Sequence, residues 1–511
     1  MFARVLAGAI AGCEPLLIEV EVDIAGGLPA FTLVGLPDAA VNESRERVRA
    51  ALKNIGLELP PRRITVNLAP ADVKKEGAGL DVPLAVALLA ASEHVPAARV
   101  KRLLFAGEMA LDGSLRHSRG ILPLALLARE RSLEGIVVPA SNVPEARVVP
   151  GLNVYGFTGL FDLVEALRAD APMTPDACES PVALPPSASF THVDLSDIKG
   201  QLSARRALEI AAAGGHNMIM VGPPGSGKTL LARAFPSILP PLEFEQAIEV
   251  TRVYSVKGLL PAGCGLLTIP PFRDPHHTIS DVALIGGGRN PAPGEVSLAH
   301  HGVLFLDELT EFKKTVLEVL REPLTEGRVS ISRAARTTGF PARFMLLAAM
   351  NPCPCGYSGD PVKGCSCSSH QVHAYQQKLS GPLLDRIDLQ LVVSRLKPDE
   401  LAGNIESESS ETVRERVLSA RRRQRARHPR GQVRLNAHLP GRLFRKDAEL
   451  DIPSTELLLK AVRAFGLSAR AYDKIIRVAR TIADLEGAET IAISHIAEAV
   501  QYRTTDPFNA A

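Results

Sequence analysis

The chain has 511 residues, of which 46% are hydrophobic and 22% are charged, and its formal net charge is +2 at pH 7. This composition excludes a disordered chain, and the length exceeds one ordinary hydrophobic core and predicts about three domains. A net charge so close to zero carries no information about partners, which has to come from local clusters of charge.

The start of the chain predicts neither a membrane span nor a signal peptide. Its longest apolar run, residues 80–91, is much shorter than the ~20 residues of a spanning helix and contains a proline. Residues 1–24 lack a charged leader followed by an apolar block. The seven cysteines, an odd number and mostly scattered, suit a reducing compartment better than a disulfide framework. We therefore expect a cytoplasmic protein.

The first part of the chain, residues 1–168, mixes strand-like and helical stretches and predicts an α/β domain with its own core. Strands are expected at 17–24, 30–36, 62–70 and 135–139, and helices at 40–56 and 122–132. Residues 169–189 are rich in proline, alanine and serine and lack periodicity, which predicts an interdomain linker.

The second part, residues 190–395, contains longer apolar strands, and the third part, residues 396–511, is mainly helical. The runs 217–222, 302–308 and 344–350 are typical of buried strands in a mainly parallel sheet. Helices are expected at 454–466, 469–487 and 493–503. We therefore predict a sheet domain followed by an arginine-rich segment and a small helical domain.

A phosphate-binding loop is predicted at MIMVGPPGSGKTLLARAF, where a strand, a glycine-rich turn and a helix follow in the required order. Backbone N–H groups of the turn can surround phosphates, Lys228 can reach the terminal phosphates, and the Thr229 hydroxyl can bind Mg²⁺. A merely structural turn would not need Lys-Thr at this place. The predicted nucleotide-binding residues are Gly222, Pro223, Pro224, Gly225, Ser226, Gly227, Lys228 and Thr229.

A second half of the same site is predicted at GVLFLDEL, where an apolar strand ends in two acidic residues. Asp307 would bind the metal ion, and Glu308 could orient and activate the attacking water. Acidic pairs after strands also occur by chance, so this prediction depends on the complete phosphate loop upstream.

Two further residues fit nucleotide hydrolysis, although each has an ordinary alternative. Asn351 ends the strand 344–350 and could bind the terminal phosphate or the water, or it could simply belong to a turn before proline. Arg386 could reach a phosphate across a subunit boundary, or it could form a surface ion pair with Asp385 or Asp388.

Together these motifs resemble the AAA+ ATPase module of the magnesium-chelatase-like clade. The resemblance covers residues 191–505 and rests on the phosphate loop, LFLDE, the strand-end asparagine, LLDRID and SARAYDKIIRVART. It implies that Asp307 and Glu308 are the Walker B pair, Asn351 is sensor 1 and Arg386 is the arginine finger. It also implies that Arg470 is the sensor 2 arginine of a C-terminal helical lid.

The amino-terminal part resembles a Lon-protease-like domain through GLPDAAVNESRERVRAALKNIG, KKEGAGLDVPLAVALLAA and GEMALDGSLRHSRGILPLALLARE. A Lon-type protease needs a serine nucleophile and a lysine base. The resemblance puts Gly79 at or near the place of the serine and Leu122 at that of the lysine. We therefore predict a non-proteolytic scaffold or binding module. This order of domains is similar to that of the ComM/YifB family of competence-related, magnesium-chelatase-like proteins.

Three segments are candidates for contact with DNA. An insertion of more than seventy residues between the phosphate loop and LFLDE includes the glycine- and proline-rich stretch 259–301 and could project into the channel of a ring. The stretch 327–350 alternates like a hairpin with Arg333 and Arg336 near its turn, which suits backbone phosphates or a plain solvated tip.

The third segment, residues 413–434, holds nine arginines and one glutamate. This density, which includes Arg421, Arg422 and Arg423, favours a basic helix that binds nucleic acid, with intersubunit ion pairs or a solvated helix as alternatives. The chain has no tryptophan and few other aromatic residues, so base stacking and sequence preference should be weak.

Two pairs of adjacent histidines invite a metal hypothesis. They are His276 with His277, and His300 with His301. Adjacent histidines rarely chelate one ion, so roles in turns or polar packing are favoured.

A cluster of four cysteines follows Asn351 directly. Cys353, Cys355, Cys365 and Cys367 form two CxC pairs within residues 353–367. Four thiolates suit tetrahedral Zn²⁺, although two intervening residues are the usual spacing, and a redox-labile pair or plain reduced cysteines remain alternatives. His370 or His373 could replace one thiolate.

The combined prediction is a ring-forming, probable hexamer that hydrolyses Mg-ATP between subunits and acts on DNA without sequence preference. The family resemblance implies helicase-like branch migration in homologous recombination and natural transformation, with recombination proteins as possible partners. The alternatives are a magnesium-chelatase motor subunit acting with porphyrin, a protease-related factor, and a ring that only coats DNA.

Overall fold

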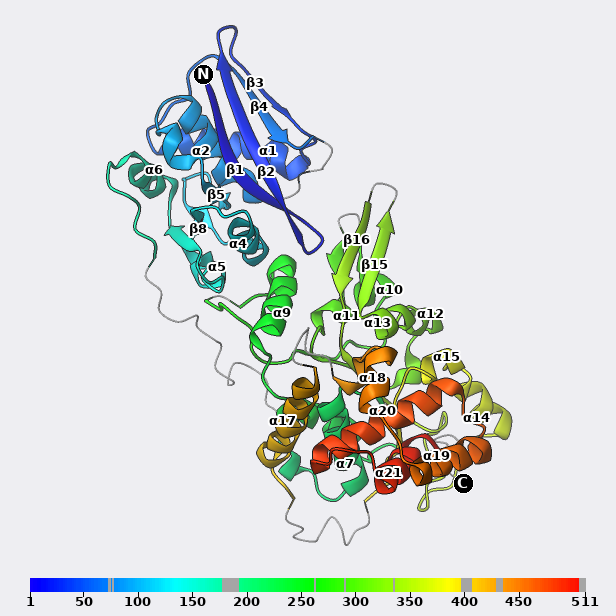
Figure 1. The fold of residues 1–511 in the computed structure, drawn as a ribbon. Helices are drawn as coiled ribbons and strands as arrows, with labels where there is room; N and C mark the ends of the chain where they lie inside the picture. Colours follow the sequence, from blue (N-terminus) through cyan, green and yellow to red (C-terminus); the bar gives the residue numbers. More distant parts are fainter. Residues whose placement is uncertain are drawn as a thin grey trace.

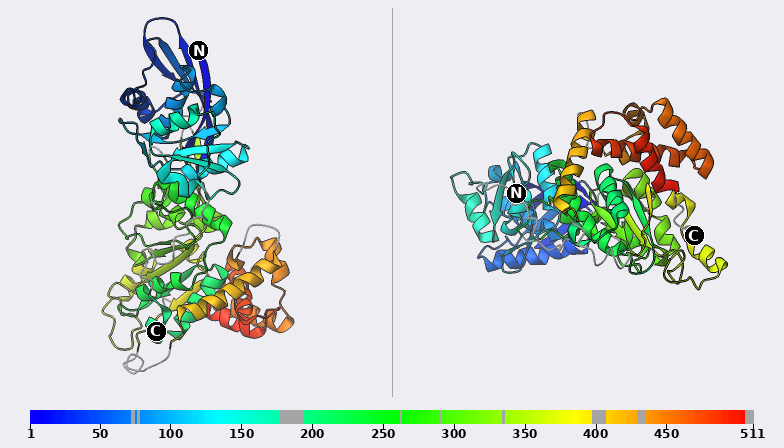
Figure 2. Two further views of the ribbon diagram at one scale, coloured as in Figure 1. Left: turned by 90° about the vertical axis from the view of Figure 1, so that its left-hand side faces the viewer. Right: turned by 90° about the horizontal axis from the view of Figure 1, so that it is seen from below.

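The computed structural model describes residues 1–71, 75, 78–176, 193–261, 263–288, 291–333, 336–396, 407–428 and 435–504. The N-terminal domain forms one end of an elongated molecule, and a second sheet domain with the C-terminal helices beside it forms the other end (Figures 1 and 2). Most of the predicted linker lies outside the described residues. Among the described residues, every helix is too short or too polar to cross a bilayer.

The N-terminal domain is built on a mixed sheet of seven strands, in the order β3-β4-β2-β1-β5-β8-β9. Its strands are β1 (Phe2–Ala11), β2 (Glu14–Ala25), β3 (Ala30–Val34), β4 (Arg63–Ala69), β5 (Leu103–Phe105), β8 (Gly135–Pro139) and β9 (Asn153–Phe157). Strand β1 pairs antiparallel with β2, and β2 with β4, whereas the other pairs are parallel. In β2, buried aliphatic residues alternate with acidic ones, which explains why this strand was predicted correctly.

Helices cover this sheet, so the predicted α/β domain is confirmed. They are α1 (Ala39–Asn54), α2 (Asp81–Ala91), α3 (Ala97–Val100), α4 (Ile121–Glu130), α5 (Val143–Ala146) and α6 (Leu160–Arg168). Shorter elements are η1 (Ala78–Leu80), η2 (Ala140–Asn142) and the hairpin of β6 (Glu108–Met109) and β7 (Leu115–Arg116). The apolar run near the start of the chain is α2, and all its residues are buried within the domain.

The second domain contains a five-stranded sheet in the order β11-β14-β17-β10-β18, and every pair in it is parallel. The strands are β10 (Met218–Val221), β11 (Phe272–Arg273), β14 (Val303–Leu306), β17 (Met345–Met350) and β18 (Leu389–Val392). In β10, Met218 and Met220 face one apolar core, whereas Ile219 and Val221 face another. The sheet is therefore covered on both faces, as its continuous apolar strands predict.

The helices of this domain surround the sheet and the connections between its strands. They are α7 (Leu202–Gly214), α8 (Lys228–Ala234), α9 (Phe244–Lys257), α10 (Asp281–Ile285), α11 (Glu295–Leu298), α12 (Lys314–Glu318), α13 (Arg321–Glu326), α14 (Ser369–Gln376) and α15 (Gly381–Leu384). Shorter elements are η3 (Leu195–Asp197), η4 (Phe235–Ile238), η5 (Leu309–Glu311), β12 (Gly286–Gly287) and β13 (Ala292–Pro293). Strands β15 (Arg328–Arg333) and β16 (Arg336–Pro341) form the predicted hairpin.

The C-terminal part is helical, as predicted. Its elements are α17 (Ser410–Arg427), η6 (Asn436–His438), α18 (Gly441–Asp447), α19 (Ile452–Phe465), α20 (Ala469–Glu486) and α21 (Ile493–Thr504). Helix α17 shares a buried core with α7 and α20, so the C-terminal helices are continuous with the core on one face of the sheet.

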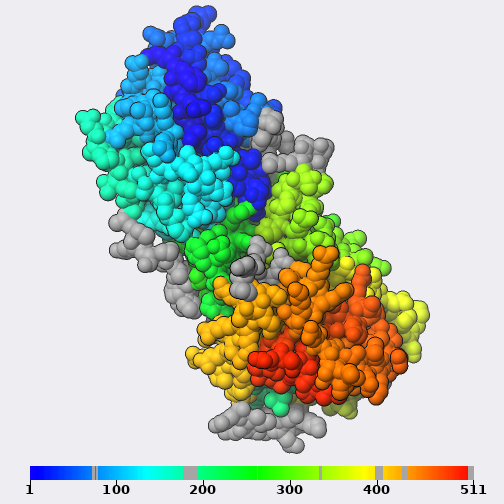
Figure 3. All heavy atoms as spheres, in the orientation of Figure 1, coloured from blue at the N-terminus to red at the C-terminus, as the bar shows by residue number. Residues whose placement is uncertain are grey.

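The N-terminal domain rests on two elements of the second domain (Figure 3). Ala247 of α9 is buried in an apolar cluster made mainly by the N-terminal domain. Cys13, in the turn between β1 and β2, is buried with Val253 of α9 and with Phe340 of the hairpin. Figure 1 shows α9 and the hairpin below the N-terminal domain.

Candidate nucleotide-binding site and cysteine loop

The predicted phosphate loop forms a tight turn between β10 and α8. Gly225 and Gly227 have positive φ angles of 77° and 91°, which favour glycine. The Lys228 Nζ donates hydrogen bonds to the carbonyl oxygens of Gly222 at 2.7 Å and Pro223 at 2.9 Å. Burial lowers the pKa of Lys228 to about 8, and the charge of Asp307 opposes this shift.

The residues predicted to hold Mg²⁺ meet at the carboxyl edge of the sheet. The Thr229 Oγ1 donates a hydrogen bond to the Asp307 Oδ2 at 2.7 Å. Asn351 follows β17, which lies between β10 and β14, and its Oδ1 accepts from the Lys228 Nζ at 3.3 Å. A hydroxyl oxygen and a carboxylate oxygen side by side are ligands that Mg²⁺ prefers, so these residues fit a Mg-nucleotide.

Glu308 lies beside this group in a rarely populated backbone conformation. Its φ angle is 50°, and its amide donates to the Asp307 Oδ1 at 2.9 Å. Its side chain is 59% exposed, so the carboxylate can meet water and substrate. Non-glycine residues with positive φ are concentrated at functional sites.

Two residues of this site were missed by the sequence prediction. Asp274 and His277 follow β11, whose carboxyl end lies at the same edge of the sheet as that of β14. Burial raises the pKa of Asp274, with the charge of Arg233 opposing this rise and that of Asp307 adding to it. The His277 Nδ1 lies 3.7 Å from the Glu308 Oε2. The stretch DPHHT brings several polar residues together, which is a signal of a site. The strand before it has only two residues, so no periodicity shows that it belongs to this sheet.

Arg386 lies away from the phosphate loop of its own chain. Its Nε donates to the Arg321 carbonyl at 3.1 Å and to the Thr325 Oγ1 at 2.9 Å, and its Nη1 donates to the Pro382 carbonyl at 2.7 Å. It lines an open cavity of about 480 Å³ with α12 and α13, and among the described lining residues none comes from 222–229. Arg386 is therefore bound to backbone and hydroxyl groups. Among the described residues, neither alternative ion pair forms, since Asp385 lies near Arg470 and Asp388 pairs with Lys474.

Arg470 lies on the same side as Arg386. It is in the first turn of α20, it is 69% exposed, and its Nη1 is 3.8 Å from the Asp385 Oδ2. Burial lowers the pKa of Arg386, and the charges of Arg321 and Arg470 add to this effect. The structure thus groups Arg470 with Arg386 instead of placing it over Lys228.

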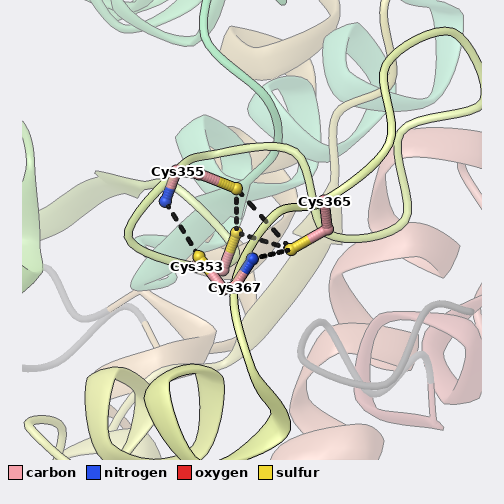
Figure 4. Close-up of side chains that lie close together, drawn as sticks. All are labelled: Cys353, Cys355, Cys365 and Cys367. Carbon is pink, nitrogen blue, oxygen red and sulfur yellow. Dashed lines mark hydrogen bonds between the residues drawn. The ribbon is translucent and has the colours of Figure 1, made fainter.

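The four cysteines of residues 353–367 converge as predicted (Figure 4). The Cys353 Sγ lies 3.4 Å from that of Cys355 and 3.7 Å from that of Cys365, and the Cys355 and Cys365 sulfurs are 3.6 Å apart. All four sulfur atoms lie within 4.8 Å of one another, and none is in a disulfide. Tetrahedral Zn²⁺ with Zn–S bonds of about 2.3 Å requires S–S separations near 3.8 Å, so the cluster fits this ion.

The cysteine loop also contacts the phosphate loop. A Cβ on Gly356 would lie 2.7 Å from the Cδ of Pro224, so the two loops are in direct contact. The Arg395 Nε lies 3.0 Å from the Asp360 Oδ2, and its Nη2 donates to the Pro224 carbonyl at 3.4 Å. The cysteine loop is therefore packed directly against the phosphate loop.

The histidine pairs take part in polar packing. Both the His300 Nε2, at 3.0 Å, and the His301 Nε2, at 2.6 Å, lie against the Glu249 Oε2. The His300 Nδ1 accepts from the Arg343 amide at 3.0 Å, so its proton is on Nε2 and is donated to Glu249. That tautomer cannot use Nε2 as a metal ligand, which favours the packing role over a metal site.

The arginine-rich helix α17 uses most of its described side chains inside the molecule. Arg416 pairs with Glu209, Arg427 pairs with Asp484, and Arg425 pairs with Glu243. Of the residues predicted to bind DNA, Arg421 donates to the Ala212 carbonyl and Arg423 to that of Asp484. Burial lowers the pKa of Arg421 to about 10, and the charge of Glu243 opposes this shift. Arg422 is exposed.

The remaining predicted residues fall in two regions. Arg333 and Arg336 pair at the end of the hairpin, and their side chains lie outside the described part of the structure. In the N-terminal domain, Gly79 lies in η1, and Leu122 is buried in α4 with its amide bound to Glu145. Neither position offers a nucleophile or a base.

Comparison with known proteins gives matches along nearly the whole chain. Three family models match, described as magnesium chelatase, subunit ChlI (residues 194–401), subunit ChlI of Mg-chelatase (20–142), and magnesium chelatase, subunit ChlI C-terminal (407–503). Competence protein ComM of Haemophilus influenzae is 43% identical over 508 residues, which cover 98% of this chain and 97% of that protein. YifB of Salmonella typhimurium is 43% identical over 96% of this chain and 94% of its own. The magnesium-chelatase 67 kDa subunit of Chlorobaculum parvum is 29% identical over 31% of this chain and 23% of its own.

Proposed function

The chain belongs to the ComM/YifB family of magnesium-chelatase-like AAA+ ATPases, and from this premise we propose that it is a ring-forming motor that uses Mg-ATP to act on DNA. ATP would bind to Lys228 and Thr229 of one subunit, with Mg²⁺ held by Thr229 and Asp307. Glu308 would activate the attacking water, and Asn351 would contact the terminal phosphate.

The observation that carries the proposal is the separation of the catalytic residues into two groups. The Thr229 hydroxyl contacts Asp307 and Lys228 contacts Asn351 at one edge of the sheet, whereas Arg386 and Arg470 lie together on another surface. A guanidinium supplied by a neighbouring subunit can neutralise charge in the transition state of phosphoryl transfer. This division supports a ring, for which we propose a hexamer, with each site shared by two subunits.

The test is ATP turnover in mixtures of two inactive variants. Lys228→Ala and Arg386→Ala should each be inactive alone, and a mixture should regain activity because some interfaces combine two intact halves. Arg422→Ala, which changes an exposed arginine outside the site, is the matched control. A mixture that stays inactive, or full activity of Arg386→Ala alone, would refute the shared site.

We propose that the substrate is DNA, bound without sequence preference, in homologous recombination and natural transformation. The similarity to competence protein ComM of Haemophilus influenzae supports a role in competence. Branch migration by a helicase-type activity in the cytoplasm, with recombination proteins as partners, follows from the family resemblance. The test is ATP turnover with single-stranded, duplex and branched DNA. Stimulation that weakens with salt is expected, and indifference to every DNA would refute this part alone.

The regions that would contact DNA are the hairpin with Arg333 and Arg336 and the exposed Arg422 of α17. The N-terminal domain would be a Lon-protease-like scaffold without proteolytic chemistry, since Gly79 and Leu122 occupy the expected places of the dyad. Zn²⁺ bound by the four cysteines would hold the loop beside the phosphate loop.

A magnesium-chelatase motor subunit is the second candidate, because all three matching family models describe subunit ChlI. Such a subunit would respond to porphyrin and its partner subunits. Porphyrin-dependent stimulation of ATP turnover, with no response to DNA, would favour this second candidate.

A further inference from the structure

The segment that follows β11 brings two neighbouring histidines to the edge of the nucleotide site. His277 faces the Glu308 carboxylate, with its Nδ1 3.7 Å from the Oε2. His276 instead faces its own turn, and its Nδ1 lies 2.9 Å from the Thr278 Oγ1. Adjacent residues of one type thus have different surroundings, and only one of the two contacts Glu308.

The His277 ring is held by its neighbours on two sides. Its centroid lies 4.0 Å from that of His276, with the ring planes tilted by 35°. It also meets Phe312 edge-on, at 6.4 Å and 77°, and Phe312 is only 3% exposed. Phe312 follows η5 directly and so belongs to the same turn as Glu308. The His277 ring therefore packs against the same turn that carries Glu308.

Glu308 needs such a partner because, within the described residues, its carboxylate makes no hydrogen bond and only His277 lies within ion-pair distance. The side chain is 59% exposed, and its backbone is in the left-handed region. An exposed glutamate carboxylate samples several rotamers, and misplacement of a catalytic group by about 1 Å can cost roughly 100-fold in rate. A donor aimed at one carboxylate oxygen would select a single rotamer.

We propose that His277 is the positioning residue of Glu308, donating a hydrogen bond from Nδ1 to the carboxylate that activates water. The present separation of 3.7 Å is longer than a hydrogen bond. Hydrogen bonds of catalytic groups are often long without substrate and shorten in the reactive complex. This inference rests on the proposed ATP hydrolysis and adds a residue from the edge strand to that site.

The experiment compares four purified full-length proteins, namely wild type, His277→Ala, His277→Asn and His276→Ala. For each, kcat and KM for ATP are measured with and without branched DNA. An asparagine amide nitrogen occupies nearly the place of a histidine Nδ1, so His277→Asn is the conservative replacement. Thermal melting and the Kd of a fluorescent ATP analogue show whether each variant is folded and binds nucleotide.

His277→Ala should lower kcat by about 10- to 100-fold with KM nearly unchanged, because only the placement of Glu308 is lost. The basal and DNA-stimulated rates should fall by the same factor. His277→Asn should recover most of kcat, and His276→Ala, which removes one neighbour of the His277 ring but keeps its Nδ1, should lower kcat less than His277→Ala does.

Three results would overturn the role of His277. They are an unchanged or raised kcat in His277→Ala, a loss confined to KM, and equal losses in His277→Asn and His277→Ala with both proteins folded. A wild-type protein that does not turn over ATP would overturn the proposed function and this role together, whereas turnover matched by His277→Ala would overturn only the role.

Discussion

His300 illustrates how a buried polar residue links stability to pH. Burial lowers its pKa to about 4, with the hydrogen bond from His300 to Glu249 opposing the shift. The neutral ring bridges α9, through Glu249, and the segment before β17, through the Arg343 amide. His300 thus links α9 to the segment before β17, and it lies itself just before β14.

The expected pH dependence follows from this depressed pKa. An unfolded histidine takes up a proton near its ordinary pKa of 6.5, whereas the folded one does so only near 4. Acidification within this window favours the unfolded state, so the free energy of unfolding should fall by up to about 1.4 kcal/mol per pH unit. Denaturant titrations at pH 7, 6 and 5 measure the slope.

His300→Gln removes the group that takes up this proton, so the free energy of unfolding should change less steeply with pH. Some slope should remain, since burial also lowers the pKa of His438 to about 4. Equal slopes for the wild type and His300→Gln would contradict the assignment.

At this scale the sequence predicted the residues whose spacing is fixed by local geometry. Lys228, Thr229 and Asp307 follow from a glycine turn and a strand end, and the structure places Thr229 against Asp307 and Lys228 against Asn351. His277 and Asp274 could not be predicted, because their nearness to Glu308 and Asp307 depends on the pairing of β11 with β14. The sequence gives no sign of that pairing in a strand of two residues.

Among the elements, helix α17 shows that the number of charged residues in a segment does not predict which partners they bind. Its buried residues Val413, Val417, Ala420 and Gln424 follow helical spacing and face α7 and α20. Its arginines bind Glu209 and Asp484, which lie far away in the sequence. The apolar stripe was visible in the sequence, whereas the acidic partners were not.

Arg427→Ala should therefore destabilise the C-terminal helices. Arg427 donates two hydrogen bonds to the buried Asp484, which would keep only Arg480 as a charged partner. Loss of one partner of a buried carboxylate should cost about 3 kcal/mol, because Arg480 remains as a second partner. Thermal melting measures the loss, and Arg422→Ala, on the exposed side of the same helix, should melt like the wild type. An unchanged melting temperature in Arg427→Ala would refute the structural role.

The cysteine loop gives a prediction about metal removal. We expect one Zn²⁺ per chain by metal analysis, and loss of it on chelation or in Cys353→Ser with Cys365→Ser. Because Gly356 and Arg395 contact Pro224 of the phosphate loop, removal of Zn²⁺ should weaken the binding of a fluorescent ATP analogue. Cys264→Ser, a buried cysteine outside the loop, is the control. Unchanged nucleotide affinity after complete zinc loss would contradict the coupling.

In the whole molecule, the N-terminal domain is fixed through α9. The Ser255 hydroxyl donates to the buried Glu145, and the Arg252 Nε donates to the Cys13 carbonyl at 2.9 Å. Burial raises the pKa of Glu145, which the hydrogen bonds from Ser255, Leu122 and Asn142 oppose. The sequence predicted a linker between the N-terminal domain and the sheet domain, but this contact could not be predicted, since α9 belongs to the segment between the phosphate loop and β11.

Ala247→Glu should separate the two domains without unfolding either one. Ala247 is fully buried between them, and an unpaired carboxylate there would be costly. Small-angle scattering should show a larger radius of gyration. Glu245→Ala, an exposed position on the same helix, should leave the radius unchanged. An unchanged radius in Ala247→Glu would mean that the contact does not hold the domains.

The position of α9 has a practical consequence for anyone who shortens this protein. A fragment that begins near residue 193 keeps every residue of the nucleotide site. It lacks the N-terminal residues that pack on Ala247 and Val253 of α9. The truncated ATPase would expose the apolar face of α9 to solvent and should aggregate or bind chaperones during purification. Replacing the newly exposed apolar side chains with polar ones should be tried first to prevent this aggregation.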